Sequence, residues 1–136
     1  MRVYTGGTFD LFHAGHANFL RQCAMLGKVY VSLNTDKFIE EYKGKPPVMS
    51  YRERKKVLEA CRHVNCVVKN IGGVDSKPAI RLVNPHIIAI DTGWAVLDYY
   101  EQMGFTQKWI DDKGMVLVYL PRTQKISTTD IKKRLK

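Results

Sequence analysis

The feature that most constrains the fold is a regular alternation of short β-branched runs with segments of helical character. Runs typical of strands lie at residues 2–5, 28–33, 66–69, 86–91 and 115–120. Segments with helical spacing or helix-start residues lie at 14–26, 50–64, 75–84 and 127–136. Strands that alternate with helices form a parallel sheet with right-handed crossovers. We therefore expect one α/β domain over residues 1–136, Rossmann-like, with about five strands and helices on both faces.

Two segments show no such pattern. Residues 34–49 are expected to form a polar loop, because Pro46 and Pro47 disfavour regular structure there. The stretch 95–113 is ambiguous, and we expect a helix around 96–103 followed by a loop.

The charge of the chain indicates a polyanionic ligand. Lysine and arginine outnumber aspartate and glutamate by 22 to 13, a formal charge of +9. Such an excess attracts nucleic acid, anionic lipid or nucleotide phosphates. The basic residues lie in separated clusters, at 43–45, 52–56, 122 and 132–136. That dispersal differs from the single basic stripe of a nucleic-acid binder, but by itself it favours no partner. No nucleic-acid partner is expected, because one would leave the paired His13 and His16 and the closing segment at 122–128 unexplained.

Hydropathy and cysteine content suggest a cytoplasmic protein. The longest apolar stretches, such as 86–90, are far shorter than the roughly 20 residues that span a bilayer. No leading charged and apolar segment resembles a signal peptide, so no membrane partner is expected. Cys23, Cys61 and Cys66 are odd in number and form no CxxC pair, which is typical of free thiols in a reducing compartment.

Parallel sheets bind ligands beyond the carboxyl ends of their strands. Three polar segments follow predicted strands and should meet at that edge, namely residues 6–16, 91–94 and 121–128. The sequence has neither a P-loop motif nor a G-x-G-x-x-G fingerprint, so phosphate would be held by other groups.

His13 and His16 are the first candidates for such chemistry. Their spacing places both imidazoles on one face if they lie in the first turn of a helix, and Gly15 between them allows close approach of a ligand. A helix N-terminus is also an anion-binding site. In the alternative, one histidine caps the helix and the other packs in the core. A zinc site would need a third ligand, and none has suitable spacing.

The closing segment offers a second anion site. Ser127 and Asp130 resemble a capping box with the shorter acid, so a helix should begin there. Its free N–H groups, the nearby hydroxyls and Arg122 would face the histidines; alternatively Ser127 is only a structural cap. Lys43 and Lys45 form either a solvated loop or a closing lid.

These motifs together resemble a known family. H-x-G-H at 13–16, preceded by G-T-F-D at 7–10, resembles the signature of the nucleotidylyltransferase superfamily. The stretch RTQKISTTDIKKRL at 122–135 is similar to the R-T-x-G-I-S-T-T motif of its cytidylyltransferase branch. Across nearly the whole chain, the spacing is most similar to the glycerol-3-phosphate cytidylyltransferases.

The resemblance implies transfer of CMP from CTP to a small phosphorylated acceptor, glycerol 3-phosphate, with release of pyrophosphate. It also implies Mg²⁺ bound mainly through the nucleotide phosphates, no protein metal site, and a homodimer. The alternatives are a relative with another acceptor or base: phosphoethanolamine, a sugar phosphate, or adenylyl transfer to FMN or phosphopantetheine.

The same resemblance assigns roles to individual positions. Catalytic roles go to His13, His16, Lys43 and Arg122. Nucleotide contacts go to Gly7, Thr8, Phe9, His13, His16, Lys45, Arg54, Trp94, Arg122, Thr123, Ser127 and Thr128. Acceptor contacts go to Arg62 and Lys43. Asp10 is interpreted either as a metal or water-shell partner or as a cap of the turn before the helix.

Three departures from the family pattern affect the substrates more than the reaction. Gly93 precedes Trp94 where the family usually has an acidic residue, and Gln124-Lys125 replaces the common Glu-Gly. An extra stretch at about 99–113 lengthens the segment before the last strand. The reaction type is therefore predicted more firmly than the acceptor.

Overall fold

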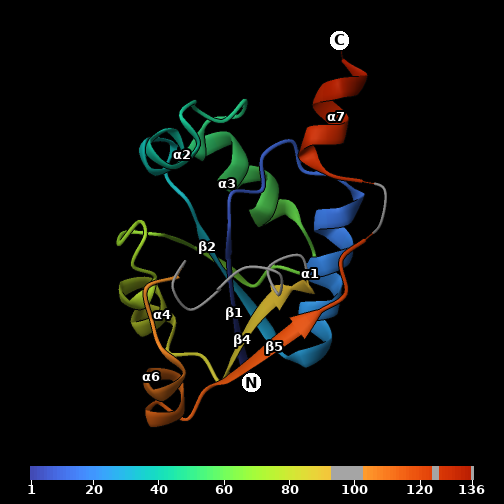
Figure 1. The fold of residues 1–136 in the computed structure, drawn as a ribbon. Coiled ribbons are helices and arrows are strands. Elements are labelled where there is room, and N and C mark those ends of the chain that lie inside the picture. The colour runs from blue at the N-terminus through green and yellow to red at the C-terminus, as the bar shows by residue number, and fades with distance from the viewer. Residues whose placement is uncertain (93–102, 124–125, 136) are drawn as a thin grey trace.

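A five-stranded parallel sheet forms the centre of the molecule (Figure 1). The structure is a computed structural model that describes residues 1–92, 103–123 and 126–135. The strands are β1 (Arg2–Gly7), β2 (Lys28–Leu33), β3 (Cys66–Lys69), β4 (Ile87–Asp91) and β5 (Val116–Leu120). Their order is β3-β2-β1-β4-β5, and every pairing is parallel. The α/β architecture expected from the alternating pattern is confirmed.

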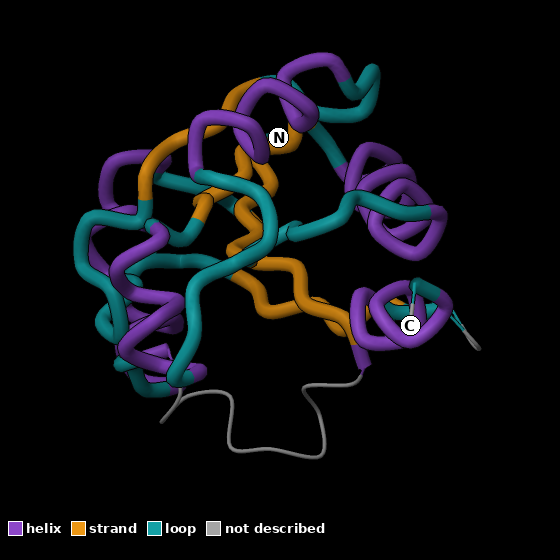
Figure 2. Tube along the Cα trace, turned by 90° about the horizontal axis from the view of Figure 1, so that it is seen from above, coloured by secondary structure: helices purple, strands orange, loops and turns teal. Residues whose placement is uncertain are grey.

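Helices cover both faces of this sheet (Figure 2). They are α1 (Ala14–Leu26), α2 (Asp36–Lys43), α3 (Tyr51–Ala60), α4 (Lys77–Val83), α6 (Gln107–Asp112) and α7 (Thr128–Arg134). Successive strand side chains point to opposite faces, so the core is divided into two clusters. Val3 packs with Leu20 of α1 and Leu58 of α3, whereas its neighbour Tyr4 packs with Ile80 of α4 and Ile110 of α6.

The segment 34–49 is not a loop throughout, contrary to our expectation, since α2 occupies half of it. Thr35 caps the start of α2 by accepting a hydrogen bond from the Phe38 amide at 3.1 Å. Gly44 ends the helix with φ of 79°, a conformation that glycine adopts readily. The two prolines lie beyond that end, so they do not prevent the helix.

Two further boundaries differ from the sequence prediction. Helix α3 begins with the expected capping box of Ser50 and Glu53 but ends at Ala60, because Cys61 is extended. A short helix, α6, occupies part of the region that we expected to be a loop, and Thr106 caps it by accepting from the Trp109 amide. The helix expected around 96–103 lies almost entirely outside the described residues.

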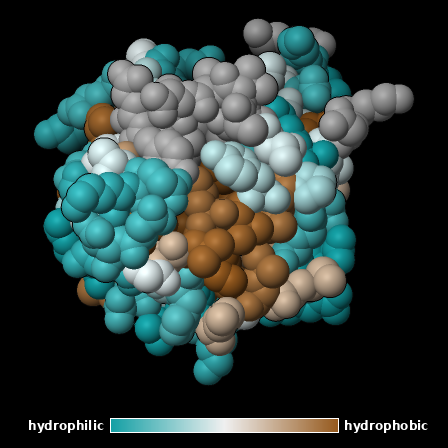
Figure 3. Space-filling view, turned by 60° about the horizontal axis from the view of Figure 1, so that its bottom comes forward, coloured by the Kyte–Doolittle hydropathy of each residue, from teal (hydrophilic) through white to brown (hydrophobic). Residues whose placement is uncertain are grey.

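Strand β5 is an edge strand with exposed apolar side chains. Val116 and Tyr119 are 58% and 43% exposed. Figure 3 shows an apolar area on the face that contains this strand. Over the described ranges, no helix is long and apolar enough to cross a bilayer.

Candidate active site

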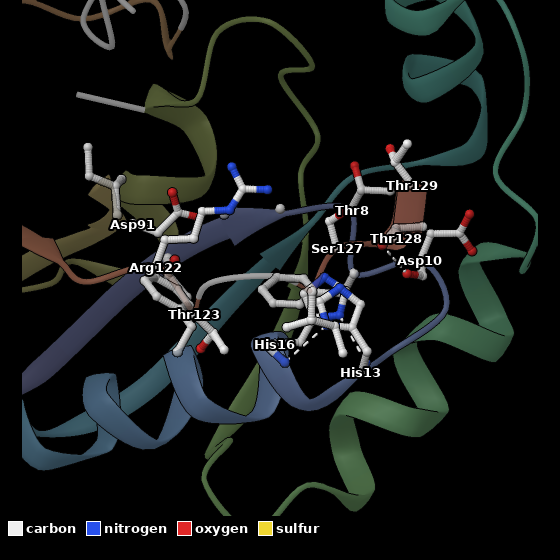
Figure 4. A pocket seen from close by; sticks show the side chains of 18 of the residues that line it. Thr8, Asp10, His13, His16, Asp91, Arg122, Thr123, Ser127, Thr128 and Thr129 are labelled. Atoms are coloured by element: carbon white, nitrogen blue, oxygen red, sulfur yellow. Dashed lines mark hydrogen bonds between the residues drawn. The ribbon is translucent and has the colours of Figure 1, made fainter. Parts of the chain in front are cut away.

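A cavity of about 450 Å³ lies at the carboxyl ends of β1 and β4, where ligands of parallel sheets bind (Figure 4). Many of the residues predicted from the sequence line it, namely Gly7, Thr8, Phe9, Asp10, His13, His16, Lys43, Arg122, Thr123, Ser127 and Thr128. Asp91, from the segment expected at this edge, lines it too. The opening and closing motifs therefore share one cavity, although more than 100 residues separate them.

The loop between β1 and α1 has an unusual backbone. Phe9 and Leu11 both have φ of 50°, a left-handed conformation that is uncommon outside glycine. The Phe9 ring is buried in the core beside α1, which holds this conformation in place. A Cβ on Gly7 would lie 2.8 Å from the Phe9 ring, so the turn requires glycine there. The packing of Phe9 thus sets the path of the histidine-bearing loop.

The two histidines cap α1 with their own side chains. Nδ1 of His13 accepts a hydrogen bond from the Gly15 amide at 3.0 Å, and Nδ1 of His16 accepts from the His13 amide at 3.2 Å. Each Nδ1 must be unprotonated to accept, so the proton of each neutral ring is on Nε2. Neither Nε2 atom has a hydrogen-bond partner among the described residues. The caps therefore leave two Nε2–H donors at the cavity, and the capping and functional interpretations coexist.

Packing keeps both rings neutral and close together. Their centroids are 3.8 Å apart in a stacked arrangement, and a Cβ on Gly15 would come within 2.8 Å of the His13 ring. Burial and the neighbouring His13 lower the pKa of His16 to about 3. Burial and the charge of Arg122 also lower the pKa of His13. Both imidazoles are thus hydrogen-bond donors without a positive charge near neutral pH.

Helix α1 anchors the closing segment beside the histidines. The Asn18 side chain donates to Thr123 Oγ1 at 2.8 Å, and Gln22 donates to the Pro121 carbonyl at 3.2 Å. Thr128 Oγ1 donates to the Asp10 carbonyl at 2.8 Å. Ser127 caps α7 by accepting from the Asp130 amide, as its spacing predicted. These contacts hold the second motif against the first.

Asp10 has a structural role that the sequence did not suggest. Its side chain is buried, and its two carboxylate oxygens accept from the Val48 and Met49 amides at 2.8 and 2.9 Å. It therefore ties the segment after Lys43 to the loop that bears the histidines. Its carbonyl also accepts a hydrogen bond from Thr128, so Asp10 connects the loop before α1 with residues 48–49 and with the start of α7.

Among the described residues, three cationic side chains line the cavity, and the sequence prediction gave no role to one of them. Arg122 and Lys43 were expected, whereas Lys132 was counted only as part of the basic cluster at 132–136. Partial burial, followed by the charge of Lys132, lowers the pKa of Lys43. The signal for Lys132 was its spacing of four from Thr128, which puts both residues on one face of the helix.

Arg54 is fully buried and does not line the cavity. Its guanidinium donates to the carbonyls of Thr8, Asn34 and Met49 at 2.9 to 3.0 Å. It also pairs with the Asp36 carboxylate at 2.6 Å. A nucleotide contact was expected for Arg54, but the structure places it behind Thr8, where it holds the loops that surround the cavity.

Two other expected residues, Lys45 and Arg62, are described and do not reach the cavity. Lys45 is exposed and does not contribute to the lining. Arg62 lies in the turn before β3, next to Asn65, whose amide donates to the Val29 carbonyl near the start of β2. Arg62 is therefore at the opposite edge of the sheet from the cavity. Trp94 lies outside the described residues.

The cavity fits an ion that is held chiefly by phosphate groups. Mg²⁺ usually retains several waters and binds one or two carboxylates together with substrate phosphates. Asp10 and Asp91 are the carboxylates on the described wall. Among the residues that the structure describes, no group of three or more His, Cys, Asp or Glu side chains is arranged to bind a metal.

Comparison with known proteins identifies the family of this chain. The profile of the cytidylyltransferase-like family matches residues 4–134. The chain belongs to the cytidylyltransferase-like family, as the two motifs indicated.

Two relatives differ in what their names say they act on. The chain is 33% identical over 136 residues to the glycerol-3-phosphate cytidylyltransferase of Staphylococcus aureus, a match that covers 98% of this chain and 94% of the relative. It is 42% identical over 91 residues to the FAD synthase of Thermococcus sibiricus. That match covers 66% of this chain and 62% of the FAD synthase, less than two thirds of its length.

A solved structure shows the same fold. The lipopolysaccharide core biosynthesis protein from Thermoplasma volcanium superposes with a TM-score of 0.73 over 93% of this chain and 98% of that one. Its sequence identity is 23%, so the likeness concerns the fold alone.

Proposed function

We propose that this protein transfers CMP from CTP to glycerol 3-phosphate, forming CDP-glycerol and pyrophosphate. The observation that carries the proposal is the pair of Nε2–H donors of His13 and His16 in a cavity that Arg122 also lines. Donors aimed at developing charge are the main means by which enzymes accelerate phosphoryl and nucleotidyl transfer. The match to a glycerol-3-phosphate cytidylyltransferase over almost the full length of both chains supports this acceptor.

In the proposed reaction, a phosphate oxygen of the acceptor attacks the α-phosphorus of CTP in line. A bond forms between that oxygen and the α-phosphorus while the bond to the bridging α–β oxygen breaks, and pyrophosphate leaves. The second pKa of a phosphate monoester is about 6, so the attacking oxygen is already anionic at neutral pH. The reaction needs no general base, which agrees with histidines whose Nδ1 atoms are occupied by backbone amides.

The side chains would divide the work as follows. His13 and His16 donate from Nε2 to oxygens of the reacting phosphates, while Arg122 and Lys43 balance the charge of the triphosphate and the acceptor. Lys132 adds a further positive charge on the same wall. Mg²⁺, held mainly by the phosphates with Asp10 and Asp91 on the nearby wall, would neutralise part of the triphosphate charge.

A second candidate function is adenylyl transfer from ATP to FMN. The 42% identity to an FAD synthase over 91 residues favours it. Both reactions use the same attack of a phosphate oxygen on an α-phosphorus, so the phosphate-binding residues do not distinguish them. Phosphoethanolamine, a sugar phosphate and phosphopantetheine are the remaining acceptors to be compared.

A substrate matrix tests the proposal directly. The protein is incubated with each of CTP, ATP, GTP and UTP and with each acceptor, and pyrophosphate release is measured with Mg²⁺ present. We expect the highest kcat/KM for CTP with glycerol 3-phosphate. A preference for ATP with FMN would establish the second candidate instead. Replacing His13 or His16 by Ala should abolish turnover while the circular dichroism spectrum is retained, and near-normal turnover would contradict the mechanism.

We further propose a cytoplasmic homodimer that binds no nucleic acid. The exposed apolar side chains Val116 and Tyr119 on edge strand β5 support an interface between copies. Light scattering after gel filtration should give twice the chain mass of 15.6 kDa. A nucleic-acid binder would instead show steeply salt-dependent affinity for DNA or RNA that survives mutation of the histidines.

A further inference from the structure

Behind the cavity wall, a chain of three side chains ends at the hydroxyl of Thr8. The Asn34 side chain donates from Nδ2 to Thr8 Oγ1 at 3.1 Å. Asn70 donates from Nδ2 to Asn34 Oδ1 at 2.9 Å and to the Gly73 carbonyl at 3.0 Å. Thr8 lines the cavity, whereas Asn34 and Asn70 do not.

The Gly73 carbonyl, at the end away from Thr8, sets the donor and acceptor of every hydrogen bond in this series of side chains. The Gly73 carbonyl only accepts, so the Asn70 side chain must present its NH₂ group there. The second proton of that NH₂ group then requires Asn34 to present Oδ1. Asn34 consequently presents its own NH₂ group to Thr8. A flipped Asn70 side chain would place its oxygen against two acceptor oxygens. In the observed orientation, Asn70 Oδ1 is buried and has no hydrogen-bond partner among the described residues.

The surroundings hold both ends of the Asn34–Thr8 contact. One nitrogen of the buried Arg54 guanidinium, Nη1, donates to the carbonyls of both residues at 2.9 Å. The Asn34 amide donates to the Gly7 carbonyl at 3.0 Å. The side chain of Asn34 therefore meets the Thr8 hydroxyl in a fixed orientation.

We propose that Asn34, oriented by Asn70, is a positioning residue that makes the Thr8 hydroxyl a hydrogen-bond donor to the nucleotide. A hydroxyl has one proton and two lone pairs. Because Thr8 Oγ1 accepts from Asn34, its proton points away from Asn34 and is available to an oxygen of a bound phosphate. The proposal rests on the function proposed above, since it needs an anionic ligand in this cavity.

The substitution Asn34→Asp tests the direction of the hydrogen bond between position 34 and Thr8, with almost no change in side-chain shape. The carboxylate still accepts from Asn70, but it now accepts from the Thr8 hydroxyl as well, so the proton turns away from the cavity. We expect kcat/KM for the nucleotide and nucleotide affinity by calorimetry to fall about 10- to 100-fold, the loss of one hydrogen bond to a charged group. Thr8→Val, which removes the hydroxyl at similar volume, should cause a similar loss.

A double-mutant cycle separates this role from mere repulsion by the new carboxylate. In the Thr8→Val background, Asn34→Asp should cost less than about threefold, because no hydroxyl remains to be turned. In the Thr8→Ser background, which keeps the hydroxyl, the full penalty should return. A full penalty in the Thr8→Val background would overturn the proposal, since it would show that the introduced carboxylate repels the nucleotide whatever occupies position 8.

Two further measurements keep the test decisive. If thermal melting shows that Asn34→Asp does not fold, Asn34→Ala takes its place in the same cycle. We then expect a smaller loss of nucleotide affinity, and this loss should again disappear in the Thr8→Val background. Equal losses in both backgrounds would overturn the proposal. Wild-type protein that binds none of the four nucleotides would overturn the proposed function and the donor role of Thr8 together. Wild-type protein that binds and turns over a nucleotide but shows additive penalties overturns only the role of Asn34.

Discussion

The low pKa of His16 predicts a defined loss of stability in mild acid. The pKa is about 3 in the folded protein, against an ordinary value of 6.5 for the unfolded chain. Above pH 6.5 the ring is neutral in both states, so it contributes no pH dependence. Between pH 6.5 and 3 only the unfolded chain takes up the proton, so folding becomes progressively less favourable as the pH falls.

The magnitude follows from these two pKa values. By proton linkage, His16 lowers the free energy of unfolding by about 2 kcal/mol when the pH falls from 8 to 5. The substitution His16→Asn should remove it, because asparagine does not titrate and its carbonyl can accept from the His13 amide as Nδ1 does. Other titrating groups remain in both proteins, so their contributions cancel to first order in the comparison.

Urea denaturation followed by circular dichroism measures this difference. When the pH changes from 8 to 5, the free energy of unfolding should fall by about 2 kcal/mol more in the wild type than in His16→Asn. The two proteins should show equal pH dependence between pH 7 and pH 8. An equal loss of stability in both proteins at pH 5 would refute the conclusion that His16 is held neutral by its surroundings.

Three other substitutions have distinct expected outcomes. Arg54→Met leaves three carbonyls and Asp36 without their donor, so we expect the free energy of unfolding to fall by about 3 kcal/mol and Tm by about 10 °C in calorimetry. An unchanged Tm would contradict the role of Arg54 in holding the loops around the cavity. Gly15→Ala should reduce turnover more than tenfold by displacing the His13 ring, while Tm changes by only a few degrees, because the helix preference of alanine offsets the lost His13 cap. Lys132→Met should lower kcat/KM for the nucleotide about tenfold, whereas Lys133→Met, outside the cavity, should change it less than twofold; equal effects would argue against a role for Lys132.

The succession of strands and the position of the site could be predicted because both depend on patterns that are local in the sequence. Runs such as 86–91 and 115–120 show their burial by composition, and parallel strands all end at one edge. The capping residues Ser50 and Ser127 also act within a few positions of themselves, and both predictions are confirmed. Local rules therefore define the frame and the two motifs of the site.

The remaining features depend on contacts between distant parts of the chain. Whether Arg54 reaches a ligand or a set of carbonyls depends on where Thr8 and Asn34 lie in space, 46 and 20 positions away. The Asp10 carboxylate likewise finds amides 38 and 39 positions along the chain. Helix α2 was missed for a different reason, since the prolines that follow its end say nothing about the residues before it. A residue type shows that a charge is present but not which partner it meets.

The contact between Thr128 and Asp10 bears on how activity is lost when the protein is stressed. It joins positions 118 apart, and α7 has no fully buried residue to hold it by hydrophobic burial. Segments with few buried contacts detach at a lower free energy than the whole domain needs to unfold. Turnover should therefore disappear at a lower urea concentration than the circular dichroism signal of the sheet. In that range the protein would keep its sheet but lack the part of the cavity wall that α7 supplies, and enzymatic activity would report on the docking of α7 rather than on global folding.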